Sequence, residues 1–429
     1  MFIIYDLIFL VFVIFSLPKY IFKEKFHQDF LLRLGILPKN LELGRPIWIH
    51  AVSVGEVIAV KEFIEELRKA YPQKKLVIST VTASGNKIAK SIARQGDFVT
   101  YLPLDFSFIV RKVLNTIKPS LVIIAETEIW PNFISYLYNK VPIVVINARI
   151  SDKSFKGYRM VKFLIKYILN KIDMFCAQTE TDATRLVSLG FSRARIRVTG
   201  NMKFDIKGYI DYNDESVELK NKIGISEDYK LFVAGSTHPK EEEIIVGVYK
   251  NLLKEFPYLR LLLVPRHPER SEEIEVEVLR QGFLPVKITR LDLSGKRPWE
   301  QKEILILNTV GQLLSFYRIA DIVFVGGSLI KKGGHNILEP ASLTKPVIFG
   351  PYMFNFREIT DLFLNSNAGI QIHNQQELEN AVRNLLINPL KMEELVRNAQ
   401  EVILKNKGAT LKNLEYIETI IKNYAKLSV

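Results

Sequence analysis

Cysteine and metal-binding patterns are almost missing from this 429-residue chain. Cys176 is the single cysteine, which excludes a disulfide within the chain and is typical of a reducing compartment. No HxxxH, HExxH or Asp-x-Asp pattern occurs, so we expect no metal site. Signatures of helix-turn-helix, zinc-finger and RNA-binding domains are also absent, and nucleic acid is not an expected partner.

Acidic residues are the minority among the charges. The chain has 59 Lys and Arg against 46 Asp and Glu, a formal net charge of +13. A basic balance favours phosphate-bearing partners such as anionic lipid or a nucleotide, although it also serves solubility alone. Hydrophobic residues make up 48% of the chain, which excludes a disordered chain. At roughly 150 residues per domain, the length predicts two or three domains.

One long apolar run occurs, at residues 1–17, and Asp6 is its single charged residue. Pro18, Lys19, Lys23 and Lys25 follow it. The run lacks the basic start and small-residue cleavage site of a signal peptide, while a buried core helix remains an alternative. We favour a membrane anchor over residues 1–22, at the short end of what spans a hydrocarbon layer of ~30 Å. The lysines would keep the rest of the chain on the cytoplasmic side.

From residue 45 onward, short runs rich in β-branched residues alternate with helix-length segments. Because most of these runs are apolar on both faces, they predict parallel sheets covered by helices on both sides. The predicted strands are 47–50, 75–80, 98–102, 121–125, 143–147, 174–178 and 196–199 in the first half, and 231–234, 261–264, 286–289, 304–307, 322–325, 347–349 and 369–372 in the second.

The polar stretch DYNDESVEL predicts a linker at 211–225. We therefore expect two doubly wound α/β domains, at 23–210 and at 226–429, the second with a helical C-terminus. Ligands of such sheets bind beyond the carboxyl ends of the strands, so facing domains would form the site in a cleft. This GT-B type of architecture occurs in nucleotide-sugar transferases, but also in epimerases and phosphorylases, so the fold alone does not give the function.

In the first half, three strand-end motifs offer charged candidates. Glu56 in HAVSVGE either complements a helix dipole or acts as a general base. Glu126 in AETEIWPN follows a buried strand, which helix capping explains poorly. Lys203 in TGNMKFD is either a solvated lysine or a contact for an anion. The spacing alone leaves these alternatives open.

The second half holds the densest pattern. Arg266 follows a strand in VPRHPER and offers a fixed positive charge for phosphate. VGGSLIKKGGHNILEPA places two glycine pairs around a basic loop, and glycines let backbone N–H groups approach a phosphate. Asn336 and Glu339 would share one face of a helical turn, where a carboxylate could accept ribose hydroxyls or form a capping box.

The motifs together resemble the 3-deoxy-D-manno-octulosonate (Kdo) transferase family. The resemblance covers about residues 45 to 357 and rests on HAVSVGE, ETEIWPN, NARISDKSFKGY, QTETDATRL, GNMKFD, GSTHPKEEE, PRHPER and FVGGSLIKKGGHNILEPA, in that order. It implies an inverting, metal-independent GT-B transferase that needs no cofactor. Its donor would be CMP-Kdo and its acceptor a lipid A precursor, on the cytoplasmic face of a bacterial inner membrane with anionic lipid.

The resemblance also assigns roles to residues. It implies that Glu56 deprotonates the acceptor hydroxyl and that Glu126 and Lys203 support the transition state. The residues implied for binding CMP are Pro265, Arg266, Val310, Gly311, Gln312, Gly327, Ser328, Asn336, Ile337, Leu338 and Glu339.

Three positions depart from the family pattern. Asn308 and Gln312 stand where the family usually has carboxylates, which puts any role for charge at Gln312 in doubt, and Lys240 replaces a glycine. Another GT-B transferase with a different nucleotide sugar and a lipid acceptor remains the main alternative, followed by an epimerase or a non-catalytic scaffold.

Overall fold

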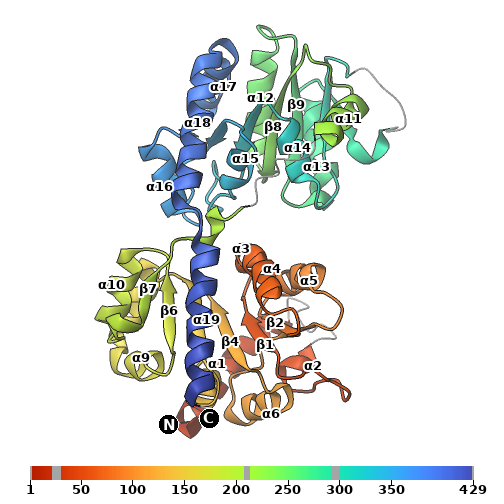
Figure 1. Cartoon of the computed structure of the whole chain (residues 1–429). Coiled ribbons are helices and arrows are strands. Elements are labelled where there is room, and N and C mark those ends of the chain that lie inside the picture. The colour runs from red at the N-terminus through yellow and green to blue at the C-terminus, as the bar shows by residue number, and fades with distance from the viewer. Residues whose placement is uncertain (1, 22–29, 207–212, 292–298, 428–429) are drawn as a thin grey trace. The chain divides into compact units, whose positions relative to one another are not determined.

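The computed structural model describes residues 2–21, 30–206, 213–291 and 299–427. The chain forms two compact units, shown in Figure 1. Unit 1 comprises Met1–Asp205 and Asn406–Val429, and unit 2 comprises Ile206–Lys405. Each unit contains a seven-stranded sheet in which every pair of neighbouring strands is parallel. The two predicted doubly wound α/β domains are therefore confirmed, while the cleft between them stays a prediction.

The sheet of unit 1 has the strand order β3-β2-β1-β4-β5-β6-β7. Its chain order reverses beside β1, between β1 and β4, which is where doubly wound sheets place their ligands. The strands are β1 (Ile47–His50), β2 (Leu76–Thr80), β3 (Phe98–Tyr101), β4 (Leu121–Ala125), β5 (Ile143–Ala148), β6 (Met174–Ala177) and β7 (Ile196–Val198).

Strand β1 shows why this sheet is buried on both faces. Trp48 joins one apolar cluster, with α6, α7, α9 and α10, whereas Ile47 and Ile49 join the cluster on the other face, with α3, α4 and α19. The alternation follows from the period of two in a strand. The helices of this unit are α1 (Phe2–Ile21), α2 (Phe30–Arg33), α3 (Val54–Ala59), α4 (Lys61–Ala70), α5 (Ala83–Ile92), α6 (Ser107–Ile117), α7 (Pro131–Leu137), α8 (Asp152–Met160), α9 (Lys162–Leu169), α10 (Glu180–Ser188) and α19 (Ala409–Leu427), with 3-10 turns η1 (Arg193–Arg195) and η2 (Met202–Phe204).

The sheet of unit 2 has the order β10-β11-β9-β8-β12-β13-β14. Helices α12, α13, α17 and α18 bury apolar side chains against one of its faces. The strands are β8 (Lys230–Thr237), β9 (Leu259–Pro265), β10 (Leu284–Lys287), β11 (Glu303–Ile306), β12 (Ile322–Val325), β13 (Val347–Phe349) and β14 (Ile370–Gln371). The helices are α11 (Asn213–Ile223), α12 (Glu241–Leu252), α13 (Ser271–Arg280), α14 (Leu313–Ile319), α15 (Leu338–Ser342), α16 (Arg357–Asn365), α17 (Gln375–Ile387) and α18 (Pro389–Asn406), with η3 (Pro268–Arg270) and η4 (Ile288–Arg290).

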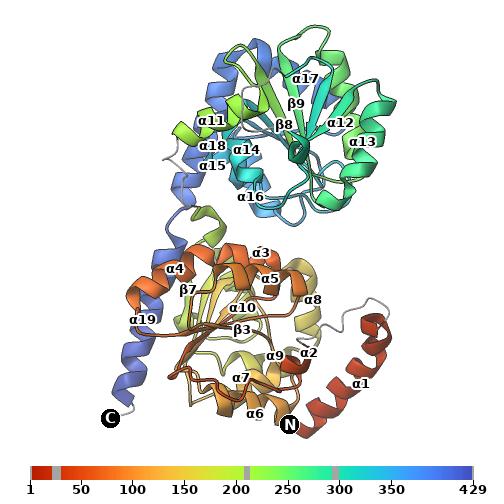
Figure 2. The ribbon, with the colours of Figure 1, turned by 90° about the vertical axis from the view of Figure 1, so that its right-hand side faces the viewer.

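The C-terminal helix corrects the expected division of the chain. Residues 226–429 do not form one domain, because α19 belongs to unit 1, where it packs against α4 (Figures 1 and 2). Asp205 accepts hydrogen bonds from the backbone N–H groups of Gly408 (2.5 Å) and Thr410 at the start of α19. The buried side chain of Ile417 then joins the apolar cluster under α4.

The predicted linker at 211–225 also differs from the structure. Its described part contains α11, which packs against α14 within unit 2. The polar composition that suggested a linker is compatible with a helix that packs by one side only. Residues 207–212 lie outside the described residues.

The N-terminal helix α1 forms over most of the predicted anchor. Within the described parts of the chain, no helix combines the length and the apolar character needed to cross a membrane, so a spanning anchor is not confirmed. Asp6, the single charge of the run, accepts hydrogen bonds from Ser107 N (3.0 Å) and Asn132 Nδ2 (2.6 Å). Phe9 packs edge-on against Phe106, with ring centroids 5.0 Å apart. One side of α1 is therefore attached to unit 1.

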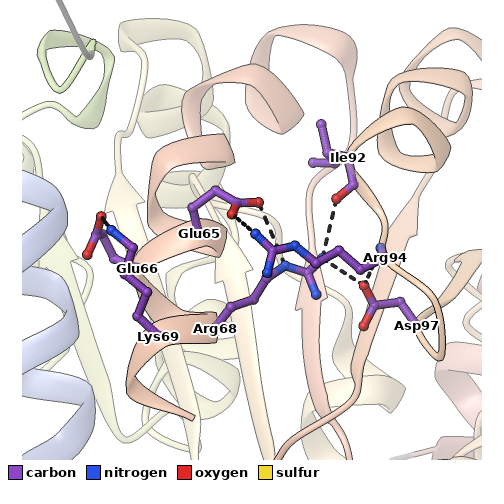
Figure 3. Close-up of polar contacts among 7 residues, drawn as sticks. All are labelled: Glu65, Glu66, Arg68, Lys69, Ile92, Arg94 and Asp97. Carbon is purple, nitrogen blue, oxygen red and sulfur yellow. Dashed lines mark hydrogen bonds and ion pairs between the residues drawn. The ribbon is translucent and has the colours of Figure 1, made fainter. Parts of the chain in front are cut away.

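A set of ion pairs fastens α4 to the segment between α5 and β3 (Figure 3). The guanidinium of Arg68 lies 2.7 Å from Asp97, and Arg94 pairs with Glu65. Asp97 also accepts the backbone N–H of Leu76 at 3.0 Å, at the start of β2. Because the Asp97 carboxylate is nearly buried and fully paired, this network fixes the helix layer rather than offering a site.

Candidate active site

The three predicted residues of unit 1 meet at the carboxyl edge of its sheet. Glu56 lies in α3, which follows β1, and Glu126 directly follows β4, the neighbour of β1. Lys203 lies on η2, after β7. Its Nζ is 3.8 Å from Glu126 Oε1. Residues that are up to 147 positions apart in the sequence (56 to 203) are thus brought to one edge, as the parallel topology predicts.

Glu126 has a strained backbone. Its φ is +58°, in the left-handed region that a side chain with a Cβ rarely adopts. The backbone N–H of Glu126 donates to Ile146 O at 2.9 Å, so the sheet ladder holds this conformation. A strained backbone conformation persists only where the surrounding structure holds it, and such conformations cluster at functional sites. In an extended backbone, Glu126 and Glu128 would share one face, but Glu126 does not have extended backbone.

The carboxylate of Glu56 is held by its own helix start. It accepts a hydrogen bond from Val52 N at 2.6 Å and one from Ser53 Oγ at 3.0 Å. Burial, and next the negative charge of Glu126, raise the pKa of Glu56 to about 7, against the two hydrogen bonds, which lower it. A carboxylic acid with a pKa near neutrality can both take up and release a proton at physiological pH, as a general base must.

Glu128 is a further acid that the sequence analysis did not select. Burial and the charge of Glu126 raise the pKa of Glu128 to about 7. Its charge in turn raises the pKa of Glu56 and of the phenol Tyr158. The signal was available, since Glu128 lies two residues after Glu126, but helix capping explained it adequately. Three interacting acids next to one lysine make this edge a place where protons are shared.

In unit 2, Arg266, Asn336 and Glu339 meet at the carboxyl edge. Arg266 is exposed and follows the buried Pro265 at the end of β9. Asn336 Nδ2 donates to Glu339 Oε1 at 3.3 Å, and Asn336 Oδ1 accepts the N–H of Leu338 at 3.1 Å. Burial raises the pKa of Glu339 to about 7, opposed by the Asn336 hydrogen bond and the charge of Arg266. These bonds are not the capping box that was the alternative for this pair, because Glu339 meets the side-chain amide of Asn336 and the N-cap residue of α15 is Ile337.

The side chains of Ile337 and Leu338 are fully buried, so only their backbone could face a ligand. The predicted turn at Val310, Gly311 and Gln312 lies between β11 and α14 and is exposed. Thr309 Oγ1 donates to Gln312 Oε1, and Asn308 Nδ2 donates to Thr289 Oγ1 at 2.8 Å. The two amides that replace carboxylates are therefore partnered within the loops.

The backbone of Gly327 and Ser328, predicted to bind the donor, is already hydrogen-bonded. The carboxylate of Glu241 accepts the N–H groups of Gly327 (2.7 Å) and Ser328 (3.0 Å), and also those of Leu329 (2.9 Å) and His238 (3.0 Å). Glu241 is fully buried, so an internal anion fills the cradle that the glycines form. The sequence analysis missed Glu241 because three of its four partners are 86 to 88 residues away.

Ser328 has a structural role through its side chain as well. Its Oγ donates to Val325 O and accepts the N–H of Gly350 at 2.8 Å. Among the residues that the structure describes, no group of three or more His, Cys, Asp or Glu side chains is arranged to hold a metal ion.

The chain is similar to known proteins in its sequence and in its fold. The profile of a family described as 3-deoxy-D-manno-octulosonic-acid transferase (kdotransferase) matches residues 28–206. A 3-deoxy-D-manno-octulosonic acid transferase of Haemophilus influenzae is 34% identical over 380 residues, covering 88% of this chain and 87% of that protein. A bifunctional glycosyltransferase/methyltransferase of Fusobacterium nucleatum is 37% identical and covers 85% of this chain and 56% of that protein.

Among solved structures, a UDP-N-acetylglucosamine 2-epimerase matches with a TM-score of 0.60 at 11% identity, covering 90% of this chain and 97% of the epimerase. This likeness concerns the fold alone. The identity to the Haemophilus transferase extends over both units, and the family profile covers the acidic edge of unit 1. The chain belongs to the 3-deoxy-D-manno-octulosonic-acid transferase family.

Proposed function

We propose that this protein transfers Kdo from CMP-Kdo to a phosphorylated lipid A precursor, with inversion at the anomeric carbon and without a metal ion or other cofactor. Membership of the family supports the transfer of Kdo. The single observation that carries the mechanism is Glu56, a positioned carboxylic acid whose pKa is raised to about 7. CMP as the nucleotide and lipid A as the acceptor class rest on the family resemblance.

In this mechanism unit 1 activates the acceptor. Glu56 takes the proton of the acceptor hydroxyl as the oxygen forms its bond to the anomeric carbon of Kdo. The bond between that carbon and the phosphate oxygen of CMP breaks, and its electron pair stays on the phosphate. One base acting on the face opposite the leaving group gives inversion. Lys203, fixed near Glu126, supplies positive charge at the same edge.

Unit 2 would bind the nucleotide. Arg266 provides a permanent positive charge for the phosphate, together with backbone groups of the turn at 310–312. Asn336 and Glu339 offer acceptors suited to ribose hydroxyls. For Gly327 and Ser328 the bonds to Glu241 support a role in shaping the loop, rather than direct donation to the phosphate.

We also propose that α1 attaches the protein to the cytoplasmic face of the bacterial inner membrane. The side chains of Ile3, Ile4, Leu7, Ile8 and Phe15 are exposed on α1, although they are large and apolar. Exposed apolar side chains on a helix, with lysines after it, favour contact with anionic lipid. Attachment through α1 would bring the enzyme to an acceptor that stays in the membrane.

The test is a transfer assay with CMP-Kdo and a tetraacylated lipid A precursor, with products measured by mass. We expect mass increments of one or more Kdo units with the wild type and none with Glu56→Gln. Glu180→Gln removes an exposed carboxylate of unit 1 and should leave transfer unchanged. Thermal protection by UDP instead of CMP would overturn the donor and favour a transferase of another nucleotide sugar.

A further inference from the structure

Two histidines at the carboxyl edge of unit 2 form a direct hydrogen bond that the proposed function has not used. His238 follows β8, and His335 lies in the basic loop after β12. Their Nε2 atoms are 3.0 Å apart and their rings are nearly parallel, with an interplanar angle of 4°. His267, after β9, stands edge-on to His238 with ring centroids 6.1 Å apart.

The bond restricts the protons that the pair can hold. One Nε2 must carry a hydrogen and donate, while the other must be bare and accept. Two imidazolium rings would place two N–H donors against each other. The pair therefore holds no additional proton or one, and the two rings titrate together.

The surroundings keep the pair neutral when no ligand is bound. Burial, and next the positive neighbours, lower the pKa of His238 to about 4 and of His335 to about 3. The groups facing the pair are Arg266, His267 and Arg270 from the end of β9 and η3, Lys332 from the basic loop, Glu241 from α12 and, next to Arg266, Glu339 from α15.

The nearby acids do not balance these cations. The carboxylate oxygens of Glu241 accept hydrogen bonds from four backbone N–H groups, one of which belongs to His238. It thereby fixes the loop that carries His238 to the loop that carries Gly327. Arg270 is paired with Glu242 at 3.0 Å, whereas Arg266 is exposed.

Gly327 has no side chain, so its backbone lies directly beside the imidazole rings of His238 and His335. With φ at +66°, a Cβ at this position would come within 3.0 Å of His335 Cδ2 and 3.3 Å of His238 Cδ2. Both histidines are half-buried, so a ligand can reach the pair from the solvent side. The site combines two polarisable rings, fixed loops and adjacent arginine and lysine side chains, which together suit an anion.

We propose that the His238–His335 pair is a proton-accepting subsite for the phosphate of the donor nucleotide, and that one proton enters the pair when the phosphate binds. This rests on the proposed function for the identity of the nucleotide. During transfer the phosphate of CMP changes from a singly charged diester to a doubly charged monoester, because it keeps the electron pair of the broken bond. A positive pair next to it stabilises the second charge, and no proton has to leave the pair.

The test counts protons by titrating CMP into the wild type in a calorimeter at pH 8, in two buffers with different ionisation enthalpies. Free CMP is then almost entirely the dianion, since the second pKa of a phosphate monoester is about 6. We expect uptake of about one proton per CMP bound. His238→Gln and His335→Gln keep an amide near the Nε2 position but cannot titrate, so uptake should vanish and affinity should fall about tenfold.

His373→Gln removes an exposed histidine of the same unit, which pairs with Glu377, and should leave proton uptake unchanged. Cytidine, which lacks phosphate, should bind without uptake. Thermal melts show whether each variant folds, and ¹⁵N shifts of the wild-type histidines report the protonation independently. CMP binding without proton uptake, or uptake that persists in both variants, would overturn the subsite and leave the donor assignment intact. Absence of CMP binding would overturn the donor assignment and this inference with it.

Discussion

The carboxyl edges of the two parallel sheets carry opposite chemistry. In unit 1, Glu56 and Glu128 crowd Glu126, and burial with like charge raises the pKa values of the first two to about 7. In unit 2, cations crowd two histidines, and burial with like charge lowers their pKa values to about 4 and 3. The edge of unit 1 therefore has acids that retain protons up to about neutral pH, whereas the edge of unit 2 has histidines that are neutral there.

Under the proposed mechanism, this difference would divide the transfer reaction between the two units. An acceptor hydroxyl must lose a proton, which suits an acid poised near neutrality. A departing phosphate gains negative charge, which suits fixed cations and bases that become positive by taking up a proton. The predictions below break or sharpen this contrast, from the largest expected effect to the smallest.

The largest expected effect comes from removing Glu56, the proposed general base of unit 1. Glu56→Gln should lower kcat for Kdo transfer by about 10²- to 10⁴-fold, the usual contribution of a general base. CMP affinity should stay within about twofold, because Glu56 belongs to unit 1. Steady-state kinetics and CMP titration measure the two effects. A variant that retains more than about a tenth of the wild-type rate would show that another group takes the proton.

Removing the exposed cation weakens the basic edge. Arg266→Ala should lower CMP affinity by about 10- to 100-fold, since hydrogen bonds to charged groups contribute about 1.5–3 kcal/mol. Arg266→Lys should recover part of this through charge alone, without the planar fork of donors. Titration of each variant with CMP and with cytidine separates the phosphate contact from the rest. An equal loss for cytidine would place Arg266 away from the phosphate.

Neutralising Glu126 should lower the pKa of Glu56. The rate of transfer should rise with pH through about 7, because Glu56 must lose its proton to act as a base. Glu126→Gln removes the charge that helps to raise the pKa of Glu56, so this rise should move to lower pH. The pH dependence of kcat/KM for both proteins gives the shift. A rise that stays in place, or moves to higher pH, would show that the charge of Glu126 does not raise the pKa of Glu56.

The same raised pKa predicts a pH-dependent stability. Between about 4.5, the ordinary pKa of Glu56, and about 7 the folded state binds more protons than the unfolded state, so stability falls as pH increases through this window. Glu56→Gln should therefore raise Tm relative to the wild type at pH 8 and have less effect at pH 4.5. Calorimetric melts at both values check the sign, and a larger gain at pH 4.5 would contradict it.

The smallest expected effect concerns the attachment of α19. Asp205→Ala removes the acceptor for the N–H groups of Gly408 and Thr410 and should cost about 1–2 kcal/mol of unfolding free energy, as for a lost helix cap. Urea unfolding measures it, and Asp152→Ala, at an exposed helix start, serves as a control. CMP affinity should be unchanged in both.

The fold was predictable from the sequence because parallel strands buried on both faces leave a strong local signal. All fourteen predicted strands occur, most within two residues of the expected bounds, as for Ile322–Val325. The boundaries of the units were not predictable from composition. Helix α19 joins unit 1 through Asp205, which lies 203 positions before Gly408, and through its own side chain Ile417, which enters the apolar cluster of unit 1.

Parts of the candidate site were predictable where a charged residue directly follows a predicted strand or begins the next helix. Glu56, Glu126 and Lys203 lie together as the motifs indicated. Glu241 was not foreseeable, because it reads as one acid among three at the start of α12 and acquires its role only when two loops meet. The bond between His238 and His335 was hidden for the same reason, since 97 residues separate them.

The return of α19 to unit 1 has a consequence for biosynthesis. The first sheet is complete once Val198 has left the ribosome, but the helix that covers part of it begins only at Ala409. At about 5–20 residues per second, the roughly 200 intervening residues take about 10–40 s to synthesise. The whole of unit 2 is synthesised during that interval as an uninterrupted segment, while the face of unit 1 that α19 covers stays uncovered.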